Sequence, residues 1–258
     1  MTYPLGGLGG DVTGQSGHTY AGVVVRLDGV PAGRPCTRPG VLAALREVRF
    51  SGWLAQPEGG WLVAVAASGD GTVAAGRRGV VGVAGWLADR LGATVLAIRV
   101  LDDRQLLLAL WVDREEIGRY VSDPSHGQQA GDGVLPDPLG VEHAAGLAAA
   151  CGRPEAADEL AELLADELDP DSVFESERLL AVLRLLGLPE WLVAVSSLPR
   201  DVPTGPRAAE VTRLGAGVSG VLGRLRGQAV DLVRRRRPPP PAITDPPRGR
   251  TGIDPWGF

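Results

Sequence analysis

The chain has 258 residues, of which 44% are hydrophobic and 22% are charged, and its formal net charge is −5. So large an apolar share in a chain of this length supports a buried core, which excludes wholesale disorder, and the length suits one large domain or a domain with appendages. All 26 basic residues are arginine, and lysine and asparagine are absent, a bias typical of GC-rich coding DNA. Arginine counts alone therefore carry little functional weight.

Residues 1–18 predict a flexible leader, because they are rich in Gly, Thr and Ser and show no periodicity. Residues 19–125 then alternate between strand and helix patterns. Alternating or continuous apolar runs predict strands at 20–27, 50–56, 61–67, 94–100 and 105–112, with a weaker strand at 117–121. Apolar spacing of three and four residues predicts helices from Val41 and from Val80.

The expected order through Val100 is strand-helix-strand-strand-helix-strand. This order is the signature of a ferredoxin-like βαββαβ sheet, and the following strands add a hairpin to it. We therefore expect an α+β fold with a ferredoxin-like domain over 19–125, a helical half and a basic amphipathic C-terminal tail.

Residues 140–200 predict a helical subdomain, with helices at 143–150, 156–168 and 174–186. Ser172 and Glu175 match a capping box at the start of the last helix, and Gly187 marks its end. The apolar run Trp191–Val195 predicts a further strand.

The C-terminal part differs from the body in charge. Residues 207–258 contain ten arginines against four acidic residues, whereas residues 1–206 carry a net charge of −11. An apolar stripe predicts a basic amphipathic helix over 207–237, and its five interior glycines mean that it needs an apolar surface in order to form. That surface is its own body, another protomer or an anionic membrane; nucleic acid is disfavoured because the stretch lacks aromatic residues.

Residues 238–258 predict a proline-rich disordered tail. The residues expected to bind a partner protein are Arg234, Arg235, Arg236, Arg237, Trp256 and Phe258.

Three motifs imitate cofactor sites. Gly215-x-Gly217-x-x-Gly220 has dinucleotide-binding spacing, but no buried strand precedes it and too little chain follows to complete a parallel sheet. The loop from Gly71 lacks the Lys-Ser/Thr ending of a phosphate loop, and the segment from Asp169 lacks the glycine of a calcium loop. We therefore expect neither an organic cofactor nor a metal.

Asp113, Asp123 and His126 are the candidate acid–base residues if folding gathers them. The adjacent Asp102 and Asp103 are turn formers more often than a catalytic pair.

Cys36 and Cys151 are too few for a disulfide framework and are expected to be small buried hydrophobes. The N-terminus lacks the charge and apolar run of a secretory signal, and the most apolar stretch is too interrupted to span a membrane. These features predict a cytoplasmic protein.

One longer pattern begins at Gly85 and reads GWLADRLGATVLAIRVLDDRQLLLALWVDREEIGRYVSDPS, and FESERLLAVLRLLGLP follows from Phe174. A helix leads to a strand that ends in an aspartate pair, then to a second strand and a Tyr-x-Ser-x-Pro segment. The positions concerned are Asp102, Asp103, Tyr120, Asp123 and Pro124. Over about a quarter of the chain this pattern resembles a family of uncharacterised actinobacterial proteins. The resemblance implies no activity.

Because no catalytic motif is complete, we expect a non-catalytic protein-interaction or adaptor module, of which an immunity-type protein is one form, that binds through its basic C-terminal segment. The alternative is a small-molecule-binding regulatory domain, since ferredoxin-like sheets often pair edge to edge and enclose ligands. A third is an enzyme that uses the acid–base residues Asp113, Asp123 and His126.

Overall fold

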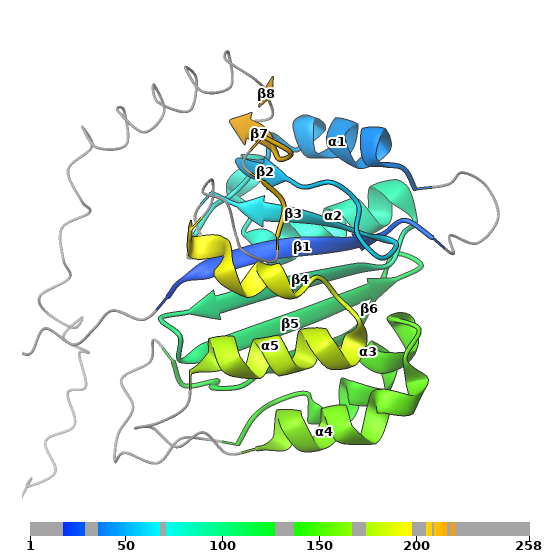
Figure 1. Cartoon of the computed structure of the whole chain (residues 1–258), viewed down its shortest axis with the longest axis vertical. Coiled ribbons are helices and arrows are strands. Elements are labelled where there is room, and N and C mark those ends of the chain that lie inside the picture. Colours follow the sequence, from blue (N-terminus) through cyan, green and yellow to red (C-terminus); the bar gives the residue numbers. More distant parts are fainter. Residues whose placement is uncertain are drawn as a thin grey trace, which may run out of the picture.

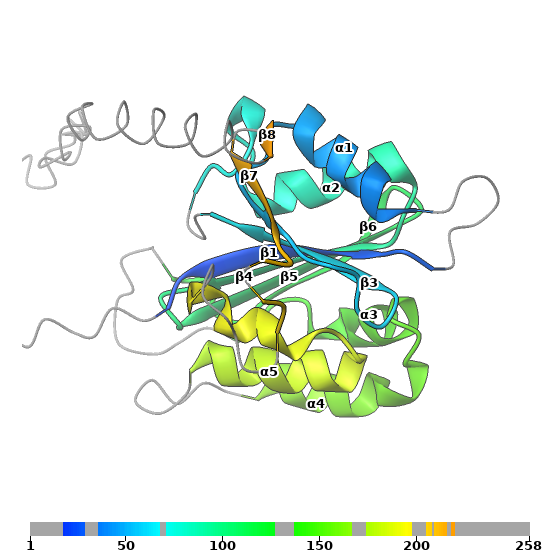
Figure 2. The ribbon, with the colours of Figure 1, turned by 45° about the horizontal axis from the view of Figure 1, so that its top comes forward.

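A computed structural model describes residues 18–28, 36–67, 71–126, 137–166, 174–197, 205–207, 209–215 and 218–219. These residues form three layers, with one β-sheet between two layers of helices (Figure 1). Figure 2 shows that one layer holds α1 (Arg38–Glu47) and α2 (Val80–Leu91), and the other holds α3 (Ala144–Ala150), α4 (Ala157–Ala165) and α5 (Glu175–Leu186).

The sheet is antiparallel throughout. Its strands are β1 (Tyr20–Arg26), β2 (Gly52–Leu54), β3 (Trp61–Ala66), β4 (Val95–Leu101), β5 (Gln105–Val112), β6 (Glu115–Val121), β7 (Thr212–Gly215) and β8 (Val218–Ser219). They lie in the order β6-β5-β4-β1-β3-β2-β7-β8, and every neighbouring pair is antiparallel. Because helices cover both faces, β4 and β5 are apolar at nearly every position, as predicted.

Local signals in the sequence start and stop the helices on the first face. α1 begins at Thr37, whose hydroxyl accepts a hydrogen bond from the Gly40 N–H. α2 ends at Gly92, which adopts the left-handed conformation with φ 61°. Between them and the sheet lies one apolar core, to which Leu45 and Leu87 contribute fully buried side chains.

The second face is covered by the later part of the chain. Short 3₁₀ turns, η2 (Val141–His143) and η3 (Pro154–Ala156), precede α3 and α4, and η4 (Glu190–Ser197) follows α5. Arg26 reaches from the end of β1 to donate a 2.7 Å hydrogen bond to the carbonyl of Ala150, at the C-terminal end of α3. A cation at this position satisfies a carbonyl that the last helical turn leaves free. None of the helices in the described ranges is long and apolar enough to cross a membrane.

The predicted α+β class is confirmed, and the sheet is antiparallel. The strands expected between residues 20 and 121, the helices expected from Val41 and Val80, and three helices in the second half are all present, with β2 shorter than expected. Most of the predicted leader 1–18 and the whole of the tail 238–258 lie outside the described residues.

Two local predictions are wrong. Residues 212–215 and 218–219 form β7 and β8, not part of a helix over 207–237. Glycine weakens a helix by about 1 kcal/mol, whereas a strand here supplies the hydrogen bonds that β2 would otherwise lack at its outer edge. The run from Trp191 forms η4 instead of a strand, because its side chains cover the sheet: Leu192 packs against Gly22 at the centre of β1.

Candidate functional site

The turn between β4 and β5 holds the N-terminus of α5. Asp102 and Asp103 have left-handed backbones there, with φ 52° and 55°, which agrees with their prediction as turn residues. Asp103 is only 6% exposed, and its Oδ1 accepts hydrogen bonds from the Ser176 N–H at 2.8 Å and the Ser176 hydroxyl at 2.6 Å. Its carbonyl accepts a third from the Glu175 N–H at 3.0 Å. Asp103 therefore caps a helix that begins more than 70 residues later in the chain.

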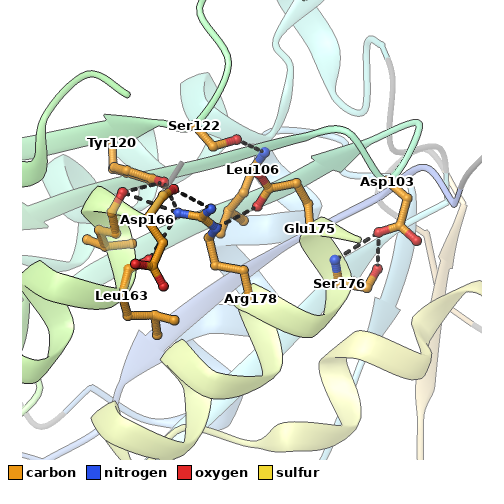
Figure 3. A network of polar contacts seen from close by, with 10 residues as sticks. Asp103, Leu106, Tyr120, Ser122, Leu163, Asp166, Glu175, Ser176 and Arg178 are labelled. Carbon is orange, nitrogen blue, oxygen red and sulfur yellow. Dashed lines mark hydrogen bonds and ion pairs between the residues drawn. The ribbon is translucent and has the colours of Figure 1, made fainter. Parts of the chain in front are cut away.

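Arg178 joins α5 to the C-terminal end of α4 (Figure 3). Its Nη1 donates to the carbonyls of Leu163 and Leu164 at 3.0 and 3.2 Å, and its Nη2 donates to the carbonyl of Asp166 at 2.7 Å. Nη1 also donates to the Tyr120 hydroxyl at 3.1 Å, which itself donates to the Leu164 carbonyl at 3.0 Å. The buried guanidinium thus satisfies the carbonyls at the end of α4 and offsets the negative end of its dipole.

Glu175 is fully buried between α5 and the sheet. Its Oε2 lies 3.5 Å from Arg178 Nε, and neither carboxylate oxygen receives a hydrogen bond of full geometry. Burial raises the pKa of Glu175; the Ser122 hydroxyl and Arg178 lower it, and the carboxylates of Asp103 and Asp123 raise it further. Desolvation is the largest of these effects.

Tyr20 of β1 closes the remaining side of this network. Its hydroxyl donates a 2.9 Å hydrogen bond to Ser176 Oγ, and burial raises its pKa beyond the usual tyrosine range. Burial also raises the pKa of Tyr120 to about 12. We call Tyr20, Asp103, Tyr120, Glu175, Ser176 and Arg178 the polar cluster. Its members bond to one another and to main-chain groups, so the arrangement holds α4, α5 and the sheet together.

The predicted acid–base trio is not assembled. His126 Nε2 lies 3.5 Å from Asp102 Oδ2, while Asp123 accepts hydrogen bonds from the N–H and hydroxyl of Ser125 at 2.9 and 2.6 Å. Asp113 lies in the turn before β6, whereas Asp123 and His126 follow that strand. Seven residues of extended strand separate the two ends by about 20 Å. Direct proton transfer between them is therefore excluded.

The described part of the chain does not gather the side chains that a metal ion needs. It contains no group of three or more His, Cys, Asp and Glu side chains that could hold a metal ion. Cys36 and Cys151 are free and buried. Gly215, the first glycine of the dinucleotide-like pattern, pairs with Val218 in the β7–β8 hairpin, so no strand-to-helix phosphate turn begins at Gly215.

The edge formed by β2 and β7 is the second feature of functional interest, and we call it the C-terminal edge. Residues 212–214 pair with 52–54, and Leu214 is 1% exposed in the core. Arg38 donates to the Thr212 hydroxyl at 2.7 Å, and the Arg213 guanidinium lies 5.9 Å from the Trp53 ring centroid. The chain is therefore anchored to the sheet immediately before its most basic segment.

The predicted partner-binding residues Arg234, Arg235, Arg236, Arg237, Trp256 and Phe258 lie outside the described residues. No protein-family model matches the chain, and comparisons with curated proteins and with solved structures give no match. The function of this chain is therefore inferred from its own residues.

The polar cluster was not predicted from the sequence. The spacing of Ser172 and Glu175 predicts a capping box, but α5 is preceded by Phe174, which provides no side-chain cap, and Ser172 lies outside the described residues. A signal was present: Glu175 and Arg178 are three residues apart, on the same helical face as the buried Leu179. Charged residues on an apolar face indicate a buried pair.

Proposed function

We propose that this protein is a non-catalytic, cytosolic protein-interaction or adaptor module that binds its partner through the arginine-rich residues after β8. The observation that carries the proposal is the C-terminal edge. Because β7 is hydrogen-bonded to β2 and Leu214 is buried, residues 212–215 are held at a fixed position on the sheet. Residues 220–258 then contain eight arginines against three acidic residues.

The rest of the described structure favours binding over catalysis. Helices cover both faces of the sheet, and the described groups whose pKa values are clearly shifted are, apart from the half-buried Arg99, buried ones such as Tyr120 and Glu175. Catalytic groups must reach a substrate, which sealed side chains cannot do without a conformational change.

The position of the C-terminal edge also bears on the alternative of an intramolecular contact. The acidic side chains of α4 belong to the layer that contacts the β6 end of the sheet, through α3 and η2. β8 is at the opposite edge, seven strand spacings or about 33 Å from β6. An intramolecular contact between the basic segment and α4 would have to cross the width of the sheet.

The test compares three forms of the protein in a binding assay with proteins from its own cell. One is the full chain, one ends at Ser219 and so keeps β7 and β8, and one is full-length with Arg234 to Arg237 all changed to glutamine. We expect the last two to lose about tenfold or more in affinity for a partner held by the full chain, equal to at least 1.4 kcal/mol. Equal affinity of all three forms would overturn the proposal. If the full chain bound only to anionic vesicles and to no protein, the partner would be a membrane surface. That result would also overturn the proposal.

The second candidate is a small-molecule-binding regulatory domain of ferredoxin-like type. The observation in its favour is the order β1-α1-β2-β3-α2-β4 together with the strand neighbours β4-β1-β3-β2 and both helices on one face. A thermal-shift screen of metabolites tests it, because a ligand at 100 times its dissociation constant adds about 2.7 kcal/mol of stability. A screen without a shift would remove this candidate.

A further inference from the structure

Glu175 is the one fully buried acid in the described residues whose carboxylate lacks a well-formed hydrogen bond. It is the first residue of α5, and its side chain lies beneath the sheet, not in solvent (Figure 3). A buried carboxylate needs several hydrogen bonds or a close cation in order to stay ionised. The surroundings of Glu175 therefore decide its charge.

The nearest cation is largely committed to other groups. The Nη1 and Nη2 donors of Arg178 go to the Tyr120 hydroxyl and to three main-chain carbonyls at the end of α4. Only Nε faces Glu175, at 3.5 Å, whereas a charge-assisted N–H···O bond is about 2.7–2.9 Å long. The pairing is thus a weak one for a site without water.

Of the other groups that act on Glu175, the Ser122 hydroxyl favours the ionised form and two nearby carboxylates favour the neutral form. Asp103 faces it from the β4–β5 turn and Asp123 from the end of β6, and both are only 6% exposed. Tyr20 of β1 and Tyr120 of β6 also interact with it electrostatically, and an ionised Glu175 raises the pKa of each. Two buried carboxylates thus act against the ionised form, and only the Arg178 guanidinium and the Ser122 hydroxyl act for it.

We propose that Glu175 is a neutral acid while α5 is seated on the sheet, and that its ionisation loosens the first turn of α5, which makes α5 a proton-sensitive latch. The first turn of α5 is the part that opens. It is held to the β4–β5 turn by hydrogen bonds to Asp103, whose carboxylate repels Glu175 once Glu175 is ionised. The far end of α5 stays fixed: Leu186 is buried, and Trp191 beyond it donates a 3.0 Å hydrogen bond to Glu58.

The direction of the pH effect follows from the raised pKa of Glu175. When the first turn is open, the carboxyl group has its ordinary pKa of about 4.5. Between that pH and the higher value in the closed form, each pH unit increases the ratio of open to closed forms by up to tenfold. Above the closed-form value the ratio becomes constant. The latch is therefore closed in acid and loosens as the pH rises.

The experiment measures hydrogen exchange of the Ser176 amide, which bonds to Asp103, over roughly pH 5 to 9 and with correction for the intrinsic rate. Three forms of the full chain are compared: wild type, E175Q, which mimics the neutral acid, and E177Q. Glu177 is exposed in the same helical turn, so E177Q is the matched control for removal of one carboxylate.

We expect the protection of Ser176 to fall with pH, by up to tenfold per unit, in wild type and E177Q, and to be constant in E175Q. A pH-independent protection in wild type, or a pH dependence that remains in E175Q, would overturn the latch. A direct titration of the Glu175 carboxyl carbon by NMR in wild type decides the matter even if E175Q does not fold. A midpoint at or below the ordinary value would show that Glu175 is ionised in the closed form, and the latch would not exist.

Discussion

Replacing Asp103 with alanine tests whether the β4–β5 turn holds α5. The change removes both hydrogen bonds from Ser176, at 2.8 and 2.6 Å. Because Asp103 is only 6% exposed, the N–H and hydroxyl of Ser176 then lose their acceptor at a position with little access to water. Loss of an N-cap costs about 1 kcal/mol. Alanine at φ 55° adds about 1 kcal/mol of strain, because only Gly, Asn and Asp adopt this conformation readily. We expect D103A to lower the free energy of unfolding by about 2 kcal/mol.

Urea denaturation measures this loss, and D102A is the matched control. Asp102 has nearly the same φ of 52°, but its side chain is 55% exposed and it does not bond to α5. D102A therefore contains the backbone strain and loses the exposed contacts of Asp102 with Thr19 and His126, but it keeps the cap, and we expect about half the loss of D103A. D103N should stay within about 1 kcal/mol of wild type, because its amide oxygen still accepts a hydrogen bond. Equal losses in D103A and D102A would refute the capping role.

Two further predictions concern the packing of the second helical layer and the thiols. G140A should lower the unfolding free energy by more than about 2 kcal/mol, because φ at Gly140 is 88° and a Cβ there would lie 1.8 Å from the Arg119 carbonyl oxygen. G146A inside α3 should raise the unfolding free energy by up to about 1 kcal/mol, because the nearest atom to an added Cβ is 3.9 Å away. Thermal unfolding of the two variants measures both effects, and a similar shift in both would be inconsistent with this packing. Burial raises the thiol pKa of Cys36 to about 11 and that of Cys151 to about 12, so both should react with a disulfide reagent at pH 8 at least tenfold more slowly in the folded protein than in urea; equal rates would show that they are accessible.

Local patterns in the sequence located most elements of this fold. The spacing from Val80 marked α2, Gly187 marked the end of α5, and the continuous apolar runs of β4 and β5 indicated strands covered on both faces. These features are fixed by propensity and periodicity among neighbouring residues, so a single sequence displays them.

Contacts between distant parts of the chain could not be predicted in this way. Asp103 and Ser176 are 73 residues apart, and Arg178 and Tyr120 are 58 apart, so no local period relates them. The pairing of β7 with β2 joins segments about 160 residues apart, and it overrode a local apolar stripe that resembled a helix. The predicted grouping of Asp113 with Asp123 and His126 was wrong for the same reason. Asp113 precedes β6 and the other two residues follow it, so the extended strand keeps them apart.

In the function that we propose, the body is a structural support and contact with the partner is made beyond β8. Hydrogen–deuterium exchange of the full chain, alone and bound to the captured partner, tests it most directly. We expect new protection in peptides from residues 220–258 and at the C-terminal edge, with no change around the polar cluster. Protection confined to residues 102–126 and the first turn of α5, with none after Ser219, would contradict it.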